Sequence, residues 1–154
     1  GHTEEVPMSE TPDQREFLAH AAIDATRMLG VKGIITDSGT GETARRLASF
    51  RGPNPVLAIC YYEKTQRWLN LSYGIIPVYQ KDSINAQVLF LAALRMLRQK
   101  GYLCDDDRLA YVSGTLGEES GATFLEINLV RDVFSKNYTF HLPPEKRGKE
   151  TMGK

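Results

Sequence analysis

Short apolar runs alternate with amphipathic stretches along most of the chain. Residues 31–36, 56–60 and 108–113 are largely apolar, which is typical of strands that are buried on both faces of a sheet. The stretches between them carry apolar residues three or four positions apart, and glycines at positions 30 and 101 end two of them. The pattern therefore predicts helices over 12–29, 43–50, 63–71 and 84–100, with strands between them.

Two further strands complete the predicted sheet. Residues 74–78 contain Pro77, which cannot donate a backbone hydrogen bond, so this strand is expected at a sheet edge. Residues 123–130 follow the strand 108–113 after a connection that is too short for a crossover helix, so this strand should return antiparallel. The fold class predicted is α/β, a three-layer α/β/α sandwich with a five-stranded, mostly parallel sheet.

The predicted first helix carries a regular apolar stripe. Leu18, Ala22, Ala25 and Leu29 lie on one line of the helix, and three more apolar residues lie beside it, namely Phe17, Ala21 and Met28. Residues at this spacing share one face of a helix, so we expect the stripe to pack into the core.

Composition limits the classes of partner and the cellular setting. The 154 residues are 42% hydrophobic and 25% charged, and Lys+Arg and Asp+Glu number 19 each, so no general attraction to nucleic acid or to anionic lipid is expected. No apolar run is long enough to span a bilayer, and no signal peptide is visible. Cys60 and Cys104 are too few for a disulfide framework, which fits a cytoplasmic setting.

Three regions are expected along the chain. Residues 1–11 resemble a cloning scar and a linker, because they begin with Gly1 and His2 and continue polar and acidic. Residues 12–131 form the α/β domain. Residues 132–154 form a C-terminal extension, expected to be partly disordered, that mixes aromatic residues with prolines and lysines. The chain is thus expected to be a fragment of something longer.

Residues 33–43 pass from an apolar run into glycines and hydroxyl side chains just before a predicted helix. Glycines let backbone N–H groups approach an anion, and a helix N-terminus adds its positive dipole end. A tight turn with a capped helix fits the same pattern. A second loop rich in glycine, residues 114–122, follows the predicted strand 108–113. These two loops are the candidate ligand edge of the fold.

The residues alone identify no catalytic centre. A phosphate-hydrolysing P-loop needs a lysine where Glu42 stands, and the Glu42 charge would oppose phosphates. A cysteine phosphatase based on Cys60 would need glycines after it, and Arg67 stands one position too far along, so a buried inert thiol is favoured. The three histidines, among them His20 on the first predicted helix, have no partners at metal-ligand spacing.

Three stretches, in this order and spacing, resemble one known family. They are residues 34–39 with 43–47 and 50–51; residues 56–59 with 63–65, 71–72, 74 and 77; and residues 112–114 with 120–121 and 123. The first is similar to the run T-x-S-G-x-[ST]-A-R, ending in an aromatic residue and an arginine, of the C-terminal domain of pyruvate kinases. The resemblance covers about residues 13–130 and is nearest to enzymes of the Bacteroidetes type.

The resemblance carries expectations about fold and function. It implies a sheet in the order 3-2-1-4-5 with the last strand antiparallel, and a non-catalytic regulatory and oligomerisation domain. The parent enzyme would transfer phosphoryl from phosphoenolpyruvate to ADP, the last step of glycolysis, with Mg²⁺ and K⁺ in an N-terminal barrel that this chain does not contain. No cofactor is expected in the domain itself. Expected partners are that barrel, a sugar-phosphate effector and further copies, making a tetramer in the parent and a dimer of the fragment.

The resemblance also implies a candidate effector site but no catalytic or metal-ligating residue. The candidate residues, matched by position, are Thr36, Asp37, Ser38, Gly39, Thr40, Thr43, Gly114, Ser120 and Gly121. The first loop is about two residues longer than usual, and four carboxylates lie in or near the loops, at Asp37, Glu42, Glu118 and Glu119, where they would repel a bisphosphate. The alternative function is a stand-alone sugar-phosphate or nucleotide-binding α/β module.

Overall fold

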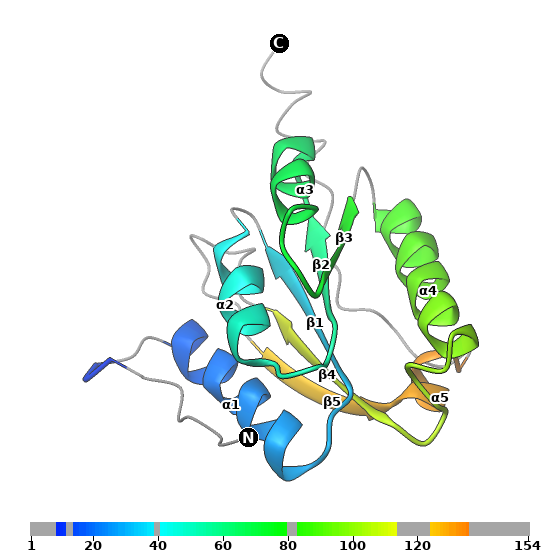
Figure 1. The fold of residues 1–154 in the computed structure, drawn as a ribbon, viewed down its shortest axis with the longest axis horizontal. Helices are drawn as coiled ribbons and strands as arrows, with labels where there is room; N and C mark the ends of the chain where they lie inside the picture. The colour runs from blue at the N-terminus through cyan, green and yellow to red at the C-terminus, as the bar shows by residue number, and fades with distance from the viewer. Residues whose placement is uncertain (1–8, 12–13, 39–40, 80–82, 114–123, 136–154) are drawn as a thin grey trace.

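A five-stranded sheet with helices on both faces forms the body of the protein (Figure 1). The computed structural model describes residues 9–11, 14–38, 41–79, 83–113 and 124–135. The strands are β1 (Gly33–Ser38), β2 (Val56–Cys60), β3 (Ile75–Tyr79), β4 (Arg108–Ser113) and β5 (Phe124–Leu129). Their order across the sheet is β3-β2-β1-β4-β5, as the family resemblance predicted.

The pairing of the strands confirms both topological predictions. β1, β2, β3 and β4 run parallel, and β5 pairs antiparallel to β4, with Ser113 opposite Phe124. β3 lies at one edge, where Pro77 pairs with Ala58 of β2 and no further described strand follows. A proline is tolerated there because an edge strand leaves one row of backbone groups outside the ladder.

Three helices cover one face of the sheet. They are α1 (Gln14–Met28), α2 (Glu42–Phe50) and α3 (Glu63–Leu69). Their buried side chains, such as Ala22, Leu47 and Leu69, meet Ile34 and Ala58 of the central strands. Burial of β2 on both faces explains why its sequence is an unbroken apolar run.

Two helices cover the opposite face. The long helix α4 (Ser83–Gln99) packs Phe90, Leu94 and Leu97 against the sheet, and the short helix α5 (Val130–Val133) adds its two valines to the same apolar cluster. The cluster also holds Tyr111, which is fully enclosed in the middle of β4. The three-layer sandwich predicted from the sequence is therefore confirmed.

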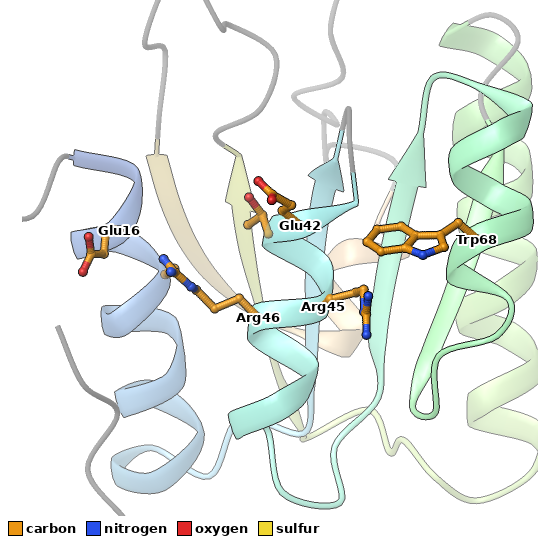
Figure 2. A pocket seen from close by; sticks show the side chains of 7 residues that line it. Glu16, Glu42, Arg45, Arg46 and Trp68 are labelled. Atoms are coloured by element: carbon orange, nitrogen blue, oxygen red, sulfur yellow. The ribbon is translucent and has the colours of Figure 1, made fainter. Parts of the chain in front are cut away.

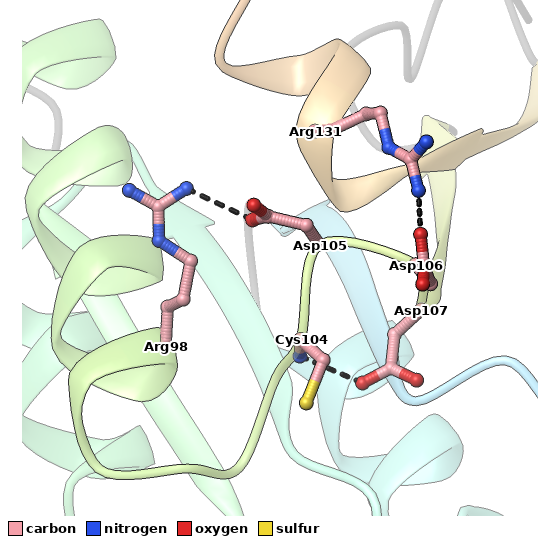
Figure 3. Close-up of polar contacts among 6 residues, drawn as sticks. All are labelled: Arg98, Cys104, Asp105, Asp106, Asp107 and Arg131. Carbon is pink, nitrogen blue, oxygen red and sulfur yellow. Dashed lines mark hydrogen bonds and ion pairs between the residues drawn. The ribbon is translucent and has the colours of Figure 1, made fainter.

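The helix α5 was not expected from the sequence. The backbone N–H of Val130 donates to the carbonyl of Asp107 at 2.8 Å, so the end of β5 is fastened to the turn before β4. Figure 3 shows two ion pairs around the same turn: Arg98 with Asp105 at 3.1 Å, and Arg131 with Asp106. One turn of helix carries too few residues for a periodic signal, which is why the pattern missed it.

The outward side of α1 differs from its prediction. Phe17 is 57% exposed, Met28 79% and Leu29 52%, whereas a core position was expected for all three. The sheet-facing side of α1 instead holds small or branched residues, namely Ala19, Ala22, Ile23 and Ala25. Small side chains let a helix approach the sheet closely, and the larger apolar residues are then left on the outer side.

The first strand lies two residues later than predicted. β1 covers Gly33–Ser38 rather than residues 31–36, although Val31 is buried just before it. Asp37, predicted to lie in the loop, is instead the fifth residue of this buried strand, where a charged residue is uncommon. Its carboxylate accepts a hydrogen bond from Tyr61, which explains how the strand can include it.

Candidate functional site

The carboxyl ends of β1 and β4 lie side by side in the sheet. Thr36 of β1 is paired with Val112 of β4, so the loops that follow the two strands begin next to each other. β1 connects through α2 to β2 on one side and has β4 on its other side, which makes this edge the topological switch point of the sheet. Ligands of open α/β folds bind in the crevice at such a point.

Two of the candidate effector residues are sealed inside the sheet. Thr36 and Asp37 have no exposed surface, and the Thr36 hydroxyl donates to the Asp37 carbonyl at 3.2 Å. The Tyr61 hydroxyl donates to Oδ2 of Asp37, also at 3.2 Å. Burial, and then the charge of Asp37, raises the pKa of Tyr61, so the phenol keeps its proton and remains a donor. The Asp37 carboxylate is thus buried and held by the Tyr61 hydroxyl.

The remaining candidates are only partly covered by the structure. Ser38 ends β1, and Thr43 lies half-buried in the first turn of α2. Outside the described residues lie Gly39, Thr40, Gly114, Ser120 and Gly121, together with the acidic pair Glu118 and Glu119. The structure therefore brings Ser38 and Thr43 to the same edge and gives no position for the opposing loop.

Gly41 sets the position of α2 against α3. It is the N-cap of α2 and has φ +91°, a conformation that glycine adopts without steric cost. A Cβ at this position would lie 2.6 Å from Cζ3 of Trp68 on α3. The glycine thus allows the start of α2 to lie directly against the indole ring.

A hollow of about 580 Å³ opens between α1, α2 and α3, beside the candidate loop (Figure 2). Its lining consists of Glu16, Ala19, Glu42, Thr43, Arg45, Arg46 and Trp68. Figure 2 shows Arg46 extending from α2 toward α1, and Trp68 extending from α3 toward α2. Only Thr43 in this lining was a candidate from the sequence.

The hollow contains cations that the sequence argument did not consider. Arg45 lies over the Trp68 ring at 4.6 Å, and Arg46 is exposed one turn from Thr43. The Glu16 carboxylate accepts hydrogen bonds from the Ser9 N–H and hydroxyl at 2.8 and 2.9 Å. A guanidinium and a hydroxyl at the start of a helix are suitable donors for an oxyanion. The paired arginines after Thr43 were a visible signal, since a helix places them on its exposed side.

Cys60 at the end of β2 is an inert thiol. Its side chain is completely enclosed, and its Sγ donates to the carbonyl of Ala58 at 3.4 Å. Burial raises the pKa of the Cys60 thiol to about 12, against an ordinary value of 9.0. Because the thiolate is the nucleophilic form, this environment opposes attack by Cys60 and confirms the interpretation as a buried core residue.

Two kinds of feature are absent from the described part of the chain. Among those residues, no group of three or more His, Cys, Asp or Glu side chains is placed to hold a metal ion. None of the helices in the same ranges has the length and apolar character that a membrane crossing requires.

Comparison with known proteins assigns the chain to a family. The family "Pyruvate kinase, alpha/beta domain" matches residues 16–128. A pyruvate kinase of Borreliella burgdorferi is 35% identical over 122 residues, which cover 77% of this chain and 26% of the relative. A pyruvate kinase of Lactobacillus delbrueckii subsp. bulgaricus is 31% identical over 110 residues, which cover 71% of this chain and 19% of the relative.

A solved structure agrees with the fold. The structure titled "Cryptosporidium parvum pyruvate kinase in complex with ADP" aligns with a TM-score of 0.64 at 20% identity, over 80% of this chain and 25% of that chain. The chain therefore belongs to the pyruvate kinase family and corresponds to its alpha/beta domain. It spans about a quarter or less of the length of these relatives. The Bacteroidetes-type assignment stays a prediction.

Proposed function

We propose that this chain is the regulatory and oligomerisation domain of a pyruvate kinase and takes no part in the chemistry. The observation that carries the proposal is the match of residues 16–128 to the alpha/beta domain of enzymes of which the chain covers 26% or less. Phosphoryl transfer from phosphoenolpyruvate to ADP, with Mg²⁺ and K⁺, would then take place in an N-terminal barrel of the parent protein.

The described side chains support a non-catalytic role. Cys60 is enclosed, and burial holds its pKa at about 12, so it does not supply a nucleophile at neutral pH. Asp37 is buried and bonded to Tyr61, which removes it from the solvent edge where a substrate would bind. Asp37 near the end of β1 and Cys60 at the end of β2 are therefore buried parts of the protein interior.

An isolated-domain assay tests the proposal. The 154-residue chain and the full-length gene product are given phosphoenolpyruvate, ADP, Mg²⁺ and K⁺, and pyruvate formation is followed by coupling to lactate dehydrogenase. We expect turnover by the full-length protein and none by the chain alone. Pyruvate formation by the purified chain would show that the proposal is wrong.

For the regulatory role, we propose a sugar-phosphate effector at the start of α2. Thr43 would donate its hydroxyl, and Arg46, in the same hollow, would supply the positive charge that the loops lack. The bond from Tyr61 to Asp37 weakens the electrostatic objection to an anion, because this carboxylate is buried and already accepts a hydrogen bond. Glu42 and Glu16 in the lining favour a ligand with few charges over a highly charged one.

Calorimetric titration tests the effector site. Fructose 1,6-bisphosphate, ribose 5-phosphate and AMP are each titrated into the chain, and the best ligand is repeated with Thr43→Ala and Arg46→Ala. We expect each substitution to weaken binding at least tenfold, while Arg67→Ala, an exposed arginine outside the hollow, leaves it unchanged. The absence of heat with all three ligands would reject the effector, and binding unaffected by both substitutions would reject this position for it.

A further inference from the structure

The hollow between α1, α2 and α3 has an aromatic wall in addition to its two arginines. Trp68 lines the hollow from α3 and is 38% exposed. Arg45 lies over its ring at 4.6 Å, and Gly41 lies directly against the ring atoms Cζ3 and Cε3. These contacts hold the indole in position and still leave part of it open to the hollow.

The charges that line the hollow are balanced. Arg45 and Arg46 supply two positive charges, and Glu16 and Glu42 supply two negative ones. One phosphate group is matched by Arg46 together with the hydroxyl of Thr43. A second phosphate would add negative charge beside two carboxylates without a further pair of donors. The lining therefore suits a ligand with one phosphate.

Glu42 is suited to the hydroxyl groups of a ribose. Its exposed side chain lies in the first turn of α2, and Figure 2 shows it between Arg46 and Trp68. A carboxylate has about four lone-pair sites, and an acidic residue accepts hydrogen bonds from ribose hydroxyls in dinucleotide-binding folds. The carboxylate that disfavours a second phosphate is thus compatible with a sugar that donates hydrogen bonds.

The indole of Trp68 matches a flat ring. Nucleobases stack on aromatic side chains because every base has a π face. The volume of the hollow, about 580 Å³, lies within the range of about 300–1,000 Å³ that is typical of small-molecule sites. A sugar phosphate without a base satisfies the arginine and the carboxylate but offers no flat π system to the indole.

We propose that the effector of this hollow is a nucleoside monophosphate, which is a sugar phosphate that also carries a base. Its phosphate accepts hydrogen bonds from Arg46 and Thr43, its ribose donates to Glu42, and its base stacks on Trp68. Arg45 keeps the indole in position. The inference rests on the proposed effector site and names the class of its ligand. Trp68 is then the residue that distinguishes nucleotides from simpler sugar phosphates.

Tryptophan fluorescence tests the stacking directly, because Trp68 is the single tryptophan of the chain. AMP and ribose 5-phosphate are titrated separately into the 154-residue chain, with excitation at a wavelength that tyrosine does not absorb. We expect AMP at saturation to lower the emission by at least half, and ribose 5-phosphate to lower it by less than a tenth. AMP that binds without quenching would overturn the proposal.

Calorimetry on two variants separates the base from the sugar phosphate. Trp68→Leu keeps an apolar side chain without a π face, whereas Trp68→Phe keeps a π face. We expect AMP to bind at least tenfold more weakly to Trp68→Leu and within threefold of the original affinity to Trp68→Phe. The affinity for ribose 5-phosphate should be equal in all three proteins, and circular dichroism should show equal helix content. Equal losses for both ligands would give Trp68 a structural role only and would overturn the proposal.

The same two ligands separate this inference from the effector site on which it rests. We expect AMP to bind at least tenfold more tightly than ribose 5-phosphate, and this advantage should disappear in Trp68→Leu. Ribose 5-phosphate that binds as tightly as AMP would overturn the nucleotide as ligand and leave the effector site intact. The absence of heat with either ligand would overturn both.

Discussion

Arg51 is a buried cation that joins two loops at the amino end of the sheet. Its Nη1 donates to the carbonyls of Gly52 at 2.8 Å and Asn54 at 2.6 Å, and its Cζ lies 5.5 Å from the centroid of the Tyr73 ring. Its Nε has no hydrogen-bond partner within the described residues, so burying it costs free energy that the other contacts of Arg51 must offset. The guanidinium lies directly against Gly74, so this glycine determines whether Arg51 can occupy its place.

Gly74→Ala should be strongly destabilising. A Cβ at this position would lie 1.7 Å from Nη2 of Arg51, and the backbone has φ +83°, so the substitution adds both a clash and backbone strain. We expect a loss of about 2–4 kcal/mol, measured by urea unfolding. Gly30→Ala is the matched control, because φ is +68° but the space is open, and it should cost only about 1 kcal/mol. Equal losses for the two variants would show that Arg51 moves aside freely.

The Cys60 thiol should make the fold sensitive to alkali. The unfolded chain releases the thiol proton near pH 9.0 and the folded protein only near pH 12, so the unfolded state holds fewer protons between these values. This contribution to stability is complete below pH 9 and is lost as pH rises, by about 1.4 kcal/mol for each unit. Urea unfolding from pH 8 to 10.5 should therefore show a steeper decline for the original chain than for Cys60→Ala. Parallel declines would contradict the raised pKa.

At the level of elements, the sequence pattern predicts correctly what the residues of a segment decide by themselves. It fails where packing against other elements decides. The unbroken apolar run of β2 predicted a buried strand, and the proline of β3 predicted an edge strand. Both predictions are confirmed. The orientation of α1 was not predicted correctly, because Phe17 and Met28 have the same local pattern whether they face a sheet or solvent. Arg45 and Trp68 meet only through the packing of α2 beside α3, and such a contact leaves no trace in the local pattern.

The helix α5 should be held by its apolar contacts more than by its ion pairs. Phe134 packs on the cluster under α4, whereas Arg131 of α5 and its ion-pair partner Asp106 have side chains that are 50% and 83% exposed. Exposed ion pairs contribute little, so we expect Asp106→Asn to cost less than about 1 kcal/mol. Phe134→Ala should cost about 1–3 kcal/mol, because it removes partly buried apolar surface. Thermal unfolding followed by circular dichroism ranks the two, and the reverse order would show that the ion pairs hold the helix.

At the level of the whole molecule, one edge combines the features of an interface. β5 has β4 on one side and no other described strand beyond it, so its outer backbone groups can pair with another chain. α1 packs beside this edge, with Ala25 next to Ile127 in one apolar cluster. The exposed Phe17 and Met28 lie on the outer side of α1, so the proposed self-association of the domain is best assigned to this edge.

Changing the outer side of α1 should weaken self-association. Phe17 and Met28 are eleven positions apart, which is three turns of helix, so their side chains lie on one line facing away from the sheet. We expect the combined Phe17→Ser and Met28→Ser variant to raise the dimer dissociation constant at least tenfold in sedimentation velocity experiments. Leu71→Ser is the control, since this residue is 86% exposed but lies after α3, on another part of the surface. A monomeric original chain at 100 μM would reject self-association of the isolated domain, and a larger effect of the control would move the interface to the end of α3.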